Sequence, residues 1–62
     1  METINLFNLK SKCHFSNGYR AYNADGMICD LDDAEYIDVI YDNCTDEYQK
    51  VAENEYQLIS AN

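Results

Sequence analysis

The sequence predicts a small α+β domain, with an antiparallel β-sheet and one amphipathic helix near its C-terminus. Three observations favour this fold class. Residues 36–41 are rich in β-branched and aromatic side chains, turn-forming pairs with glycine separate short apolar segments before them, and the apolar residues after position 46 follow a helical period. A chain of 62 residues can enclose only one small core, so we expect a single domain over residues 1–62.

Short strands are expected in the first half of the chain. Residues 3–9 alternate imperfectly between polar and apolar side chains, which favours a first strand over a helix. Asn17-Gly18 has β-compatible flanks and predicts a hairpin, because both central residues of a type I′ turn need positive φ. A second turn is predicted at residues 23–26, and a further strand at residues 27–31.

Residues 36–41 are predicted to form the strand around which the sheet is organised. Ile37 and Val39 share one face of this strand, which we expect to be buried. Asp38 lies on the other face, which we expect to be partly solvated, as is common for one side of an antiparallel sheet.

Residues 46–59 are expected to form an amphipathic helix that lies on the sheet. Thr45 is a suitable N-cap, and Asp46 and Glu47 in the first turn suit the positive end of the helix dipole. Neither glycine nor proline interrupts the segment. Its apolar side chains gather on one side of a helical wheel: Tyr48, Val51, Ala52, Tyr56, Leu58 and Ile59.

An all-β barrel is the alternative fold. Residues 21–26 with their Asp-Gly turn, the strand-like residues 36–43, and the apolar positions Val51, Leu58 and Ile59 resemble a Tudor-like or other SH3-like small barrel. This likeness covers about half of the chain and requires the C-terminal segment to be extended. The aromatic cage of that family has no residue-by-residue match here, so the resemblance implies an alternative fold and no function.

The charge of the chain is large and uneven. The net charge is −8, with residues 1–22 summing to +2 and residues 23–62, which hold eleven acids and one lysine, summing to −10. Nucleic acids and anionic membranes both require a basic surface, so we expect neither to bind directly. A larger basic protein is the favoured partner.

No segment is expected to direct export or to cross a membrane. Residues 1–9 lack the charged and continuously apolar regions of a signal peptide, and no run approaches the about 18 apolar residues that a spanning helix needs. Cys13, Cys29 and Cys44 are an odd number without a CxxC pair. We therefore expect reduced thiols and a cytoplasmic location, in the host cytoplasm if the protein is viral.

No metal site, cofactor or catalytic site is expected. Residues 23–28 match the centre of an EF-hand calcium loop, but Ala21 stands at the first ligand position, and a β-turn is preferred. Cys13 and His14 are adjacent and point to opposite faces of a strand, which opposes both a zinc site and a Cys–His dyad. The abundant carboxylates lie in solvated runs and not in a cleft, so we expect no enzyme.

The acidic surface is the feature expected to carry function. DNA is itself a dense array of negative charge, so a small acidic protein can occupy the basic nucleic-acid channel of a larger protein. The hypothesis is a non-enzymatic, stoichiometric inhibitor of the viral counter-defence type, which docks on a nucleic-acid-processing protein by charge mimicry. The predicted partner-binding residues are Asp30, Asp32, Asp33, Glu35, Asp38 and Asp42 for charge, with Tyr36 and Tyr41 as anchors.

Three other interpretations stay open at the level of the sequence, and one of them is a calcium-responsive or zinc-stabilised domain. The net negative charge can serve only to keep a small protein soluble. Alternatively, the small core favours a homodimerising regulatory or assembly module that associates through a helix face or a sheet edge.

Overall fold

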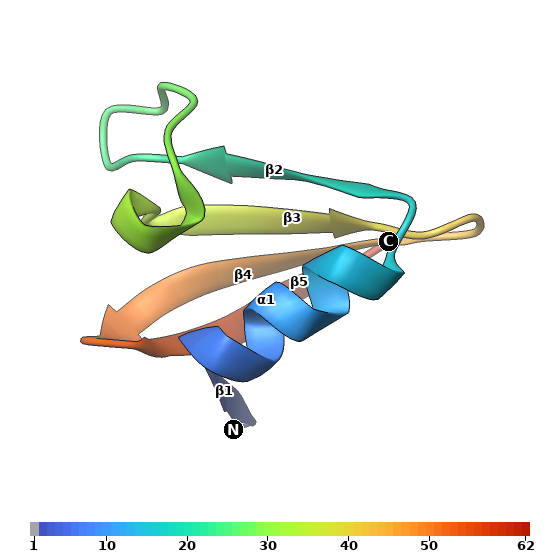
Figure 1. The fold of residues 1–62 in the computed structure, drawn as a ribbon, viewed down its shortest axis with the longest axis horizontal. Coiled ribbons are helices and arrows are strands. Elements are labelled where there is room, and N and C mark those ends of the chain that lie inside the picture. Colours follow the sequence, from blue (N-terminus) through green and yellow to red (C-terminus); the bar gives the residue numbers. More distant parts are fainter. Residues whose placement is uncertain (1) are drawn as a thin grey trace.

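The chain folds into two layers, a five-stranded antiparallel sheet and one α-helix that lies across one face of it (Figure 1). The structure is a computed structural model and describes residues 2–62. Over these residues the elements are β1 (Thr3–Asn5), α1 (Leu6–Phe15), β2 (Gly18–Tyr22), the short 3₁₀-helix η1 (Leu31–Asp33), β3 (Tyr36–Ile40), β4 (Thr45–Ala52) and β5 (Glu55–Ala61). The α+β class predicted from the sequence is confirmed, but the position of its helix was wrong.

The strands lie in the order β1-β5-β4-β3-β2, and every neighbouring pair is antiparallel. The strand predicted at residues 36–41 is confirmed as β3, which ends one residue earlier. Because β1 and β2 occupy opposite edges, the sheet formed by the described residues stays open and does not close into an SH3-like barrel. The extended C-terminal segment that the barrel alternative required is nevertheless present.

The C-terminal helix predicted at residues 46–59 is a β-hairpin. β4 and β5 pair along most of their length around a turn at Glu53 and Asn54, and Asn54 has the positive φ of 61° that such tight turns require. Two β-bulges explain the misleading helical period, because they place Val51 and Ile59 outside the regular alternation. A helix would have buried these two side chains, whereas the hairpin leaves both about half exposed.

The first helix lies where the sequence favoured a strand. β1 covers only the start of the strand predicted at residues 3–9, and α1 follows it directly. The Asn5 side chain caps α1 by accepting a hydrogen bond from the backbone N–H of Asn8 at 2.8 Å. Leu9 and Cys13, one turn apart on the same side, are then buried against the sheet. Tertiary burial of this stripe outweighs the weak local preference for an extended chain.

The Asn17-Gly18 pair joins α1 to β2 and does not form the predicted hairpin. The backbone N–H of Asn17 donates to the carbonyl of Ile40, which already belongs to the pairing of β2 with β3. Gly18 begins β2 with a φ of 153°, a backbone conformation that residues with a side chain rarely adopt. The glycine is therefore needed for the change of direction, although in a different type of connection.

The turn predicted at residues 23–26 is confirmed. The backbone N–H of Gly26 donates to the carbonyl of Asn23, and Gly26 has a φ of 82°. The strand predicted at residues 27–31 was wrong, because only a single bridge between Tyr22 and Ile28 forms before the chain enters η1. The three aspartates at positions 30, 32 and 33 favour the short helical turn over a longer edge strand, because aspartate is depleted in strands.

The core lies between α1 and one face of the sheet. Leu9, Ile37, Val39 and Tyr56 are almost completely enclosed. The Tyr56 hydroxyl donates to the carbonyl of Ala34 at 2.6 Å, which satisfies a polar group in this apolar layer. The described residues contain no helix that is both long and apolar enough to cross a bilayer.

Candidate functional site: the open face of the sheet

The face of the sheet opposite α1 is the candidate site, and we call it the open face. It is defined by the strand register, since residues directly opposite each other on paired strands share a face. The helix α1 packs on the other side of the sheet (Figure 1). The open face is formed in its centre by Arg20 and Tyr22 of β2, Tyr36, Asp38 and Ile40 of β3, and Thr45, Glu47 and Gln49 of β4.

Two carboxylates lie side by side in the middle of the open face. Asp38 of β3 is directly opposite Glu47 of β4, and Arg20 of β2 is opposite Asp38 on the other side. Arg20 is exposed. The ion pair found within residues 2–62 joins Lys10 to Asp32 and lies away from this face. The register therefore brings two like charges together, an arrangement that destabilises a sheet unless something else requires it.

The electrostatic state of this pair depends on Glu47. Partial burial, the charge of Asp38 and a hydrogen bond with Asp38 all raise the pKa of Glu47 above its ordinary value. One oxygen of Asp38, Oδ1, is enclosed and has no hydrogen-bond donor. When Glu47 is protonated, its O–H can donate a hydrogen bond to Asp38. When both carboxylates are ionised, neither can donate to the other.

Two tyrosine rings lie on one side of the carboxylate pair. Tyr22 and Tyr36 are directly opposite each other on β2 and β3, and both are half-buried. Gln49 donates from Nε2 to the Tyr36 hydroxyl at 3.3 Å, which helps to fix the ring on the sheet. Tyrosine offers a rigid apolar surface with a polar tip, and is enriched at the energetic centres of protein interfaces.

The structure divides the predicted partner-binding residues among three places. Tyr36 and Asp38 lie on the open face. Asp30, Asp32 and Asp33 lie in and just before η1, at the start of β3, and Asp32 accepts a hydrogen bond from Lys10 of α1 at 2.5 Å. Glu35 connects η1 to β3 and is half-buried.

Tyr41 and Asp42 follow the other end of β3. Tyr41 packs against the core cluster, and burial together with the nearby charge of Asp46 raises the pKa of its hydroxyl. Asp42 is exposed and accepts a hydrogen bond from the Asn17 side chain. The eight residues therefore follow β3 from end to end, but only two of them lie on the open face.

Sequence reasoning missed Glu47, Arg20 and Tyr22 as parts of the site. Glu47 was assigned to the first turn of a helix, where its neighbour across the sheet could not be seen. The alternation of Arg20 and Tyr22 with Tyr19 and Ala21 was available in the sequence and places the first two on one face of a strand. The pairing with β3, which sequence alone did not provide, is what joins them to Asp38.

The three cysteines are free thiols. Burial raises the pKa of Cys13, and partial desolvation with the charges of Asp33 and Asp30 raises the pKa of Cys29. Since the thiolate is the reactive form, both shifts reduce nucleophilicity at neutral pH. In the calcium-like segment, the Asn23 side-chain oxygen accepts backbone hydrogen bonds from Asp25 and Met27, so it serves the turn. Residues 2–62 contain no cluster of three metal-ligating side chains.

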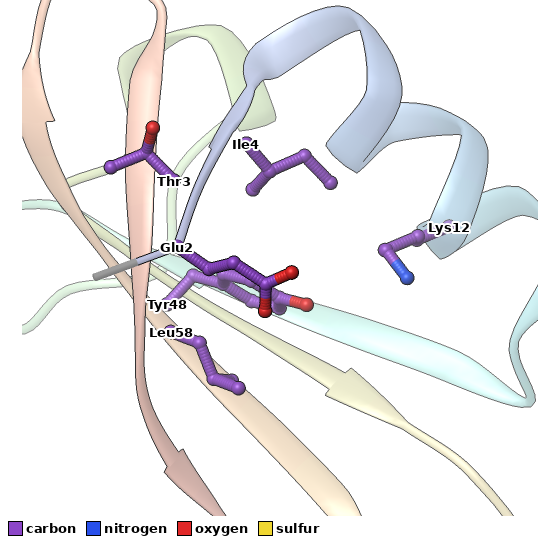
Figure 2. Close-up of a pocket in the computed structure, with 6 residues that line it drawn as sticks. All are labelled: Glu2, Thr3, Ile4, Lys12, Tyr48 and Leu58. Carbon is purple, nitrogen blue, oxygen red and sulfur yellow. The ribbon is translucent and has the colours of Figure 1, made fainter.

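A half-open hollow of about 200 Å³ lies on the other side of the molecule, next to α1. Figure 2 shows its apolar floor, with Glu2 and Lys12 at its rim. The lining residues are Glu2, Thr3, Ile4, Lys12, Tyr48 and Leu58. The hollow is small for a ligand pocket and offers one acid and one base without a third group to orient them. It does not form a catalytic arrangement.

No known family matches the chain, and neither the curated proteins nor the solved structures include a similar one. The function has to be argued from the geometry of the open face itself.

Proposed function

We propose that this protein is a small, non-enzymatic binding protein whose open face docks on a basic surface of a larger protein. The partner surface in this proposal is one that ordinarily holds nucleic acid, so that the protein acts as a stoichiometric inhibitor, as counter-defence proteins of viruses do. The observation that carries the proposal is the pair Asp38 and Glu47, which lies next to the Tyr22–Tyr36 pair on the sheet face opposite α1.

The distribution of charge supports a basic partner. α1 carries Lys10 and Lys12 and no acid, so it holds two of the four basic side chains on the covered face. The rest of the chain holds all twelve acids against Arg20 and Lys50, a net charge of −10. A positively charged surface is attracted to the chain outside α1, and such steering accelerates association.

The chemistry of the carboxylate pair supports the same partner. A guanidinium of the partner placed over Asp38 and Glu47 faces two carboxylates that form no ion pair within residues 2–62. A cation at that position also offsets the repulsion that raises the pKa of Glu47. Relief of this repulsion contributes favourably to binding.

Further acidic residues lie at the two ends of β3. The η1 acids lie before the strand and Asp42 lies after it, so negative charge runs along its whole length. From Glu35 to Asp42 an extended chain spans roughly 20 Å. Over the same length duplex DNA carries about twelve charges, so the protein resembles a sparse version of the backbone that a basic channel binds.

A cytoplasmic location belongs to the same proposal, because three free thiols are stable in a reducing compartment. The weak nucleophilicity of the Cys13 thiol and the simple chemistry of the hollow near α1 support a role in binding and not in catalysis.

The test is capture of partners on the immobilised protein, followed by elution with duplex DNA. The wild-type protein is expected to retain a nucleic-acid-binding protein that DNA or moderate salt releases. The double variant Asp38→Asn/Glu47→Gln is expected to lose most of that retention. The matched control is Asp25→Asn/Glu53→Gln, which makes the same change in charge at exposed turns and should retain the partner. Equal retention by all three proteins, or a captured protein that DNA does not release, would contradict the proposal.

A further inference from the structure

The outer surface of α1 exposes two aromatic side chains to solvent. Phe7 is 81% exposed and Phe15 is 82% exposed, the highest values among the large hydrophobic residues of the described chain. They lie on the side of α1 opposite to Leu9 and Cys13, which are buried against the sheet. Two exposed phenylalanines on one helix form a surface that favours contact with another apolar surface.

The spacing of these two residues is symmetric about Ser11. Phe7 precedes Ser11 by four residues and Phe15 follows it by four, so all three lie along one stripe of the helix. The two phenylalanines are separated by about 12 Å along the helix axis. If two copies of α1 cross in antiparallel orientation at Ser11, each Phe7 meets the second copy's Phe15. The small serine at the crossing point allows the helices to approach closely.

The charge distribution favours a second copy at this surface. Copies with a net charge of −8 repel each other over most of their surfaces, but α1 contains no carboxylate. Its lysines lie at the flanks of the stripe and face acids of their own chain. Lys10 pairs with Asp32 at 2.5 Å, and Lys12 shares the rim of the hollow with Glu2 (Figure 2). His14 packs edge-to-face on Phe15 at 5.0 Å between ring centroids, which adds a third ring to this surface.

We propose that the protein forms an isologous dimer through the outer surface of α1, with Phe7 of each copy packed on the second copy's Phe15. Four phenylalanine side chains of about 200 Å² each, mostly exposed in the monomer, give roughly 650 Å² of buried aromatic surface. Stable specific dimers bury at least about 1,200 Å², so the dimer is a weak one that forms at high concentration.

The dimer has a consequence for the open face. Because α1 covers one face of the sheet, helix-to-helix pairing directs the two open faces away from each other (Figure 1). A dimer then presents two acidic surfaces at once, and it can bind a partner that has two basic sites more tightly than a monomer can. The dimerisation itself does not depend on the proposed function of the open face.

The test is sedimentation equilibrium of the purified protein over about two decades of concentration. The wild-type protein is expected to show a monomer–dimer equilibrium. Phe7→Ala or Phe15→Ala should each weaken the dimer by about tenfold or more, because either change removes both phenylalanine pairs. Ile28→Ala is the matched control, since Ile28 is 80% exposed but lies outside α1, and it should leave the equilibrium unchanged.

A mixture of the two alanine variants gives the sharpest result. In a heterodimer of Phe7→Ala with Phe15→Ala, one pair becomes Ala–Ala but the other is an intact Phe–Phe pair. The mixture should therefore associate more strongly than either variant alone, and added salt should strengthen the association of these like-charged copies. A wild-type protein that is monomeric at every concentration, or a mixture no stronger than its components, would overturn the proposal.

Discussion

Replacement of Glu47 by glutamine should stabilise the protein at neutral pH. The change removes the like-charge contact with Asp38 and brings an amide N–H next to the enclosed Oδ1. A like-charged pair directly opposite across two strands costs about 0.2–1 kcal/mol, and a new hydrogen bond contributes about 0.5–1.5 kcal/mol. Since the side chains are partly solvated, we expect a net gain of about 1 kcal/mol in the free energy of unfolding at pH 7.

The dependence of this gain on pH follows from the direction of the pKa shift. The pKa of Glu47 is raised in the folded state, so the folded protein binds this proton more tightly than the unfolded chain does. The stability that the protonated group contributes is fully present below its unfolded pKa and is lost as the pH rises through its folded pKa. The advantage of Glu47→Gln should therefore be largest at pH 7 and should shrink as the pH approaches 4.

Urea unfolding followed by circular dichroism measures this difference. For a domain of this size an m-value of about 1 kcal/mol/M converts the expected gain into a midpoint increase of about 1 M at pH 7. Glu53→Gln removes one charge at the exposed β4–β5 turn and controls for the change in net charge alone. The reasoning is refuted if Glu47→Gln lowers the midpoint, or if both variants raise it equally and independently of pH.

Three further substitutions test the fold. Tyr56→Phe removes the buried hydrogen bond to the Ala34 carbonyl and should cost about 1 kcal/mol in urea unfolding, so an unchanged midpoint would mean that this bond does not contribute. Leu9→Ala opens a cavity under α1 and should cost about 2–5 kcal/mol, enough to unfold much of the protein at 25 °C; a fully folded variant by circular dichroism would contradict the placement of Leu9 in the core. Asn54→Val should lower the melting temperature clearly and Asn54→Gly should not, because Asn54 has positive φ; equal melting temperatures would argue against the β4–β5 turn.

The sequence predicted β3 correctly because its signal is local. The alternation of Ile37 and Val39 with Asp38 gives one buried and one solvated face, and the structure places these side chains on those faces. The turn at Asn23–Gly26 was also predicted correctly, because the glycine has the positive φ that the pattern implies.

The errors arose where distant pairing decides the structure. Bulges near Tyr48 and Val51 give a strand the apolar spacing of a helix, and only the pairing of β4 with β3 and β5 shows the difference. The helix α1 has no strong amphipathic pattern, because Phe7 and Phe15 lie on its outer side while Leu9 and Cys13 are buried. Apolar residues on both sides of a helix conceal its period.

The candidate site was predictable in its residue types and not in its geometry. Asp38 and Tyr36 were identified from the strand to which they belong. Glu47 joins them only because β4 is antiparallel to β3 in one particular register, and a shift of one residue would have moved it to the other face. Long-range register is the information that a single sequence lacks.

Chemical-shift mapping by NMR tests the central claim most directly. An oligoarginine peptide titrated into the ¹⁵N-labelled protein serves as a defined basic ligand. The account predicts that the largest shifts occur at Tyr36, Asp38 and Glu47 on the open face, and that Asp38→Asn/Glu47→Gln abolishes them. If the largest shifts instead occur at the turn residues Asp25 and Glu53, or are spread evenly over all acidic residues, the open face is not the docking surface.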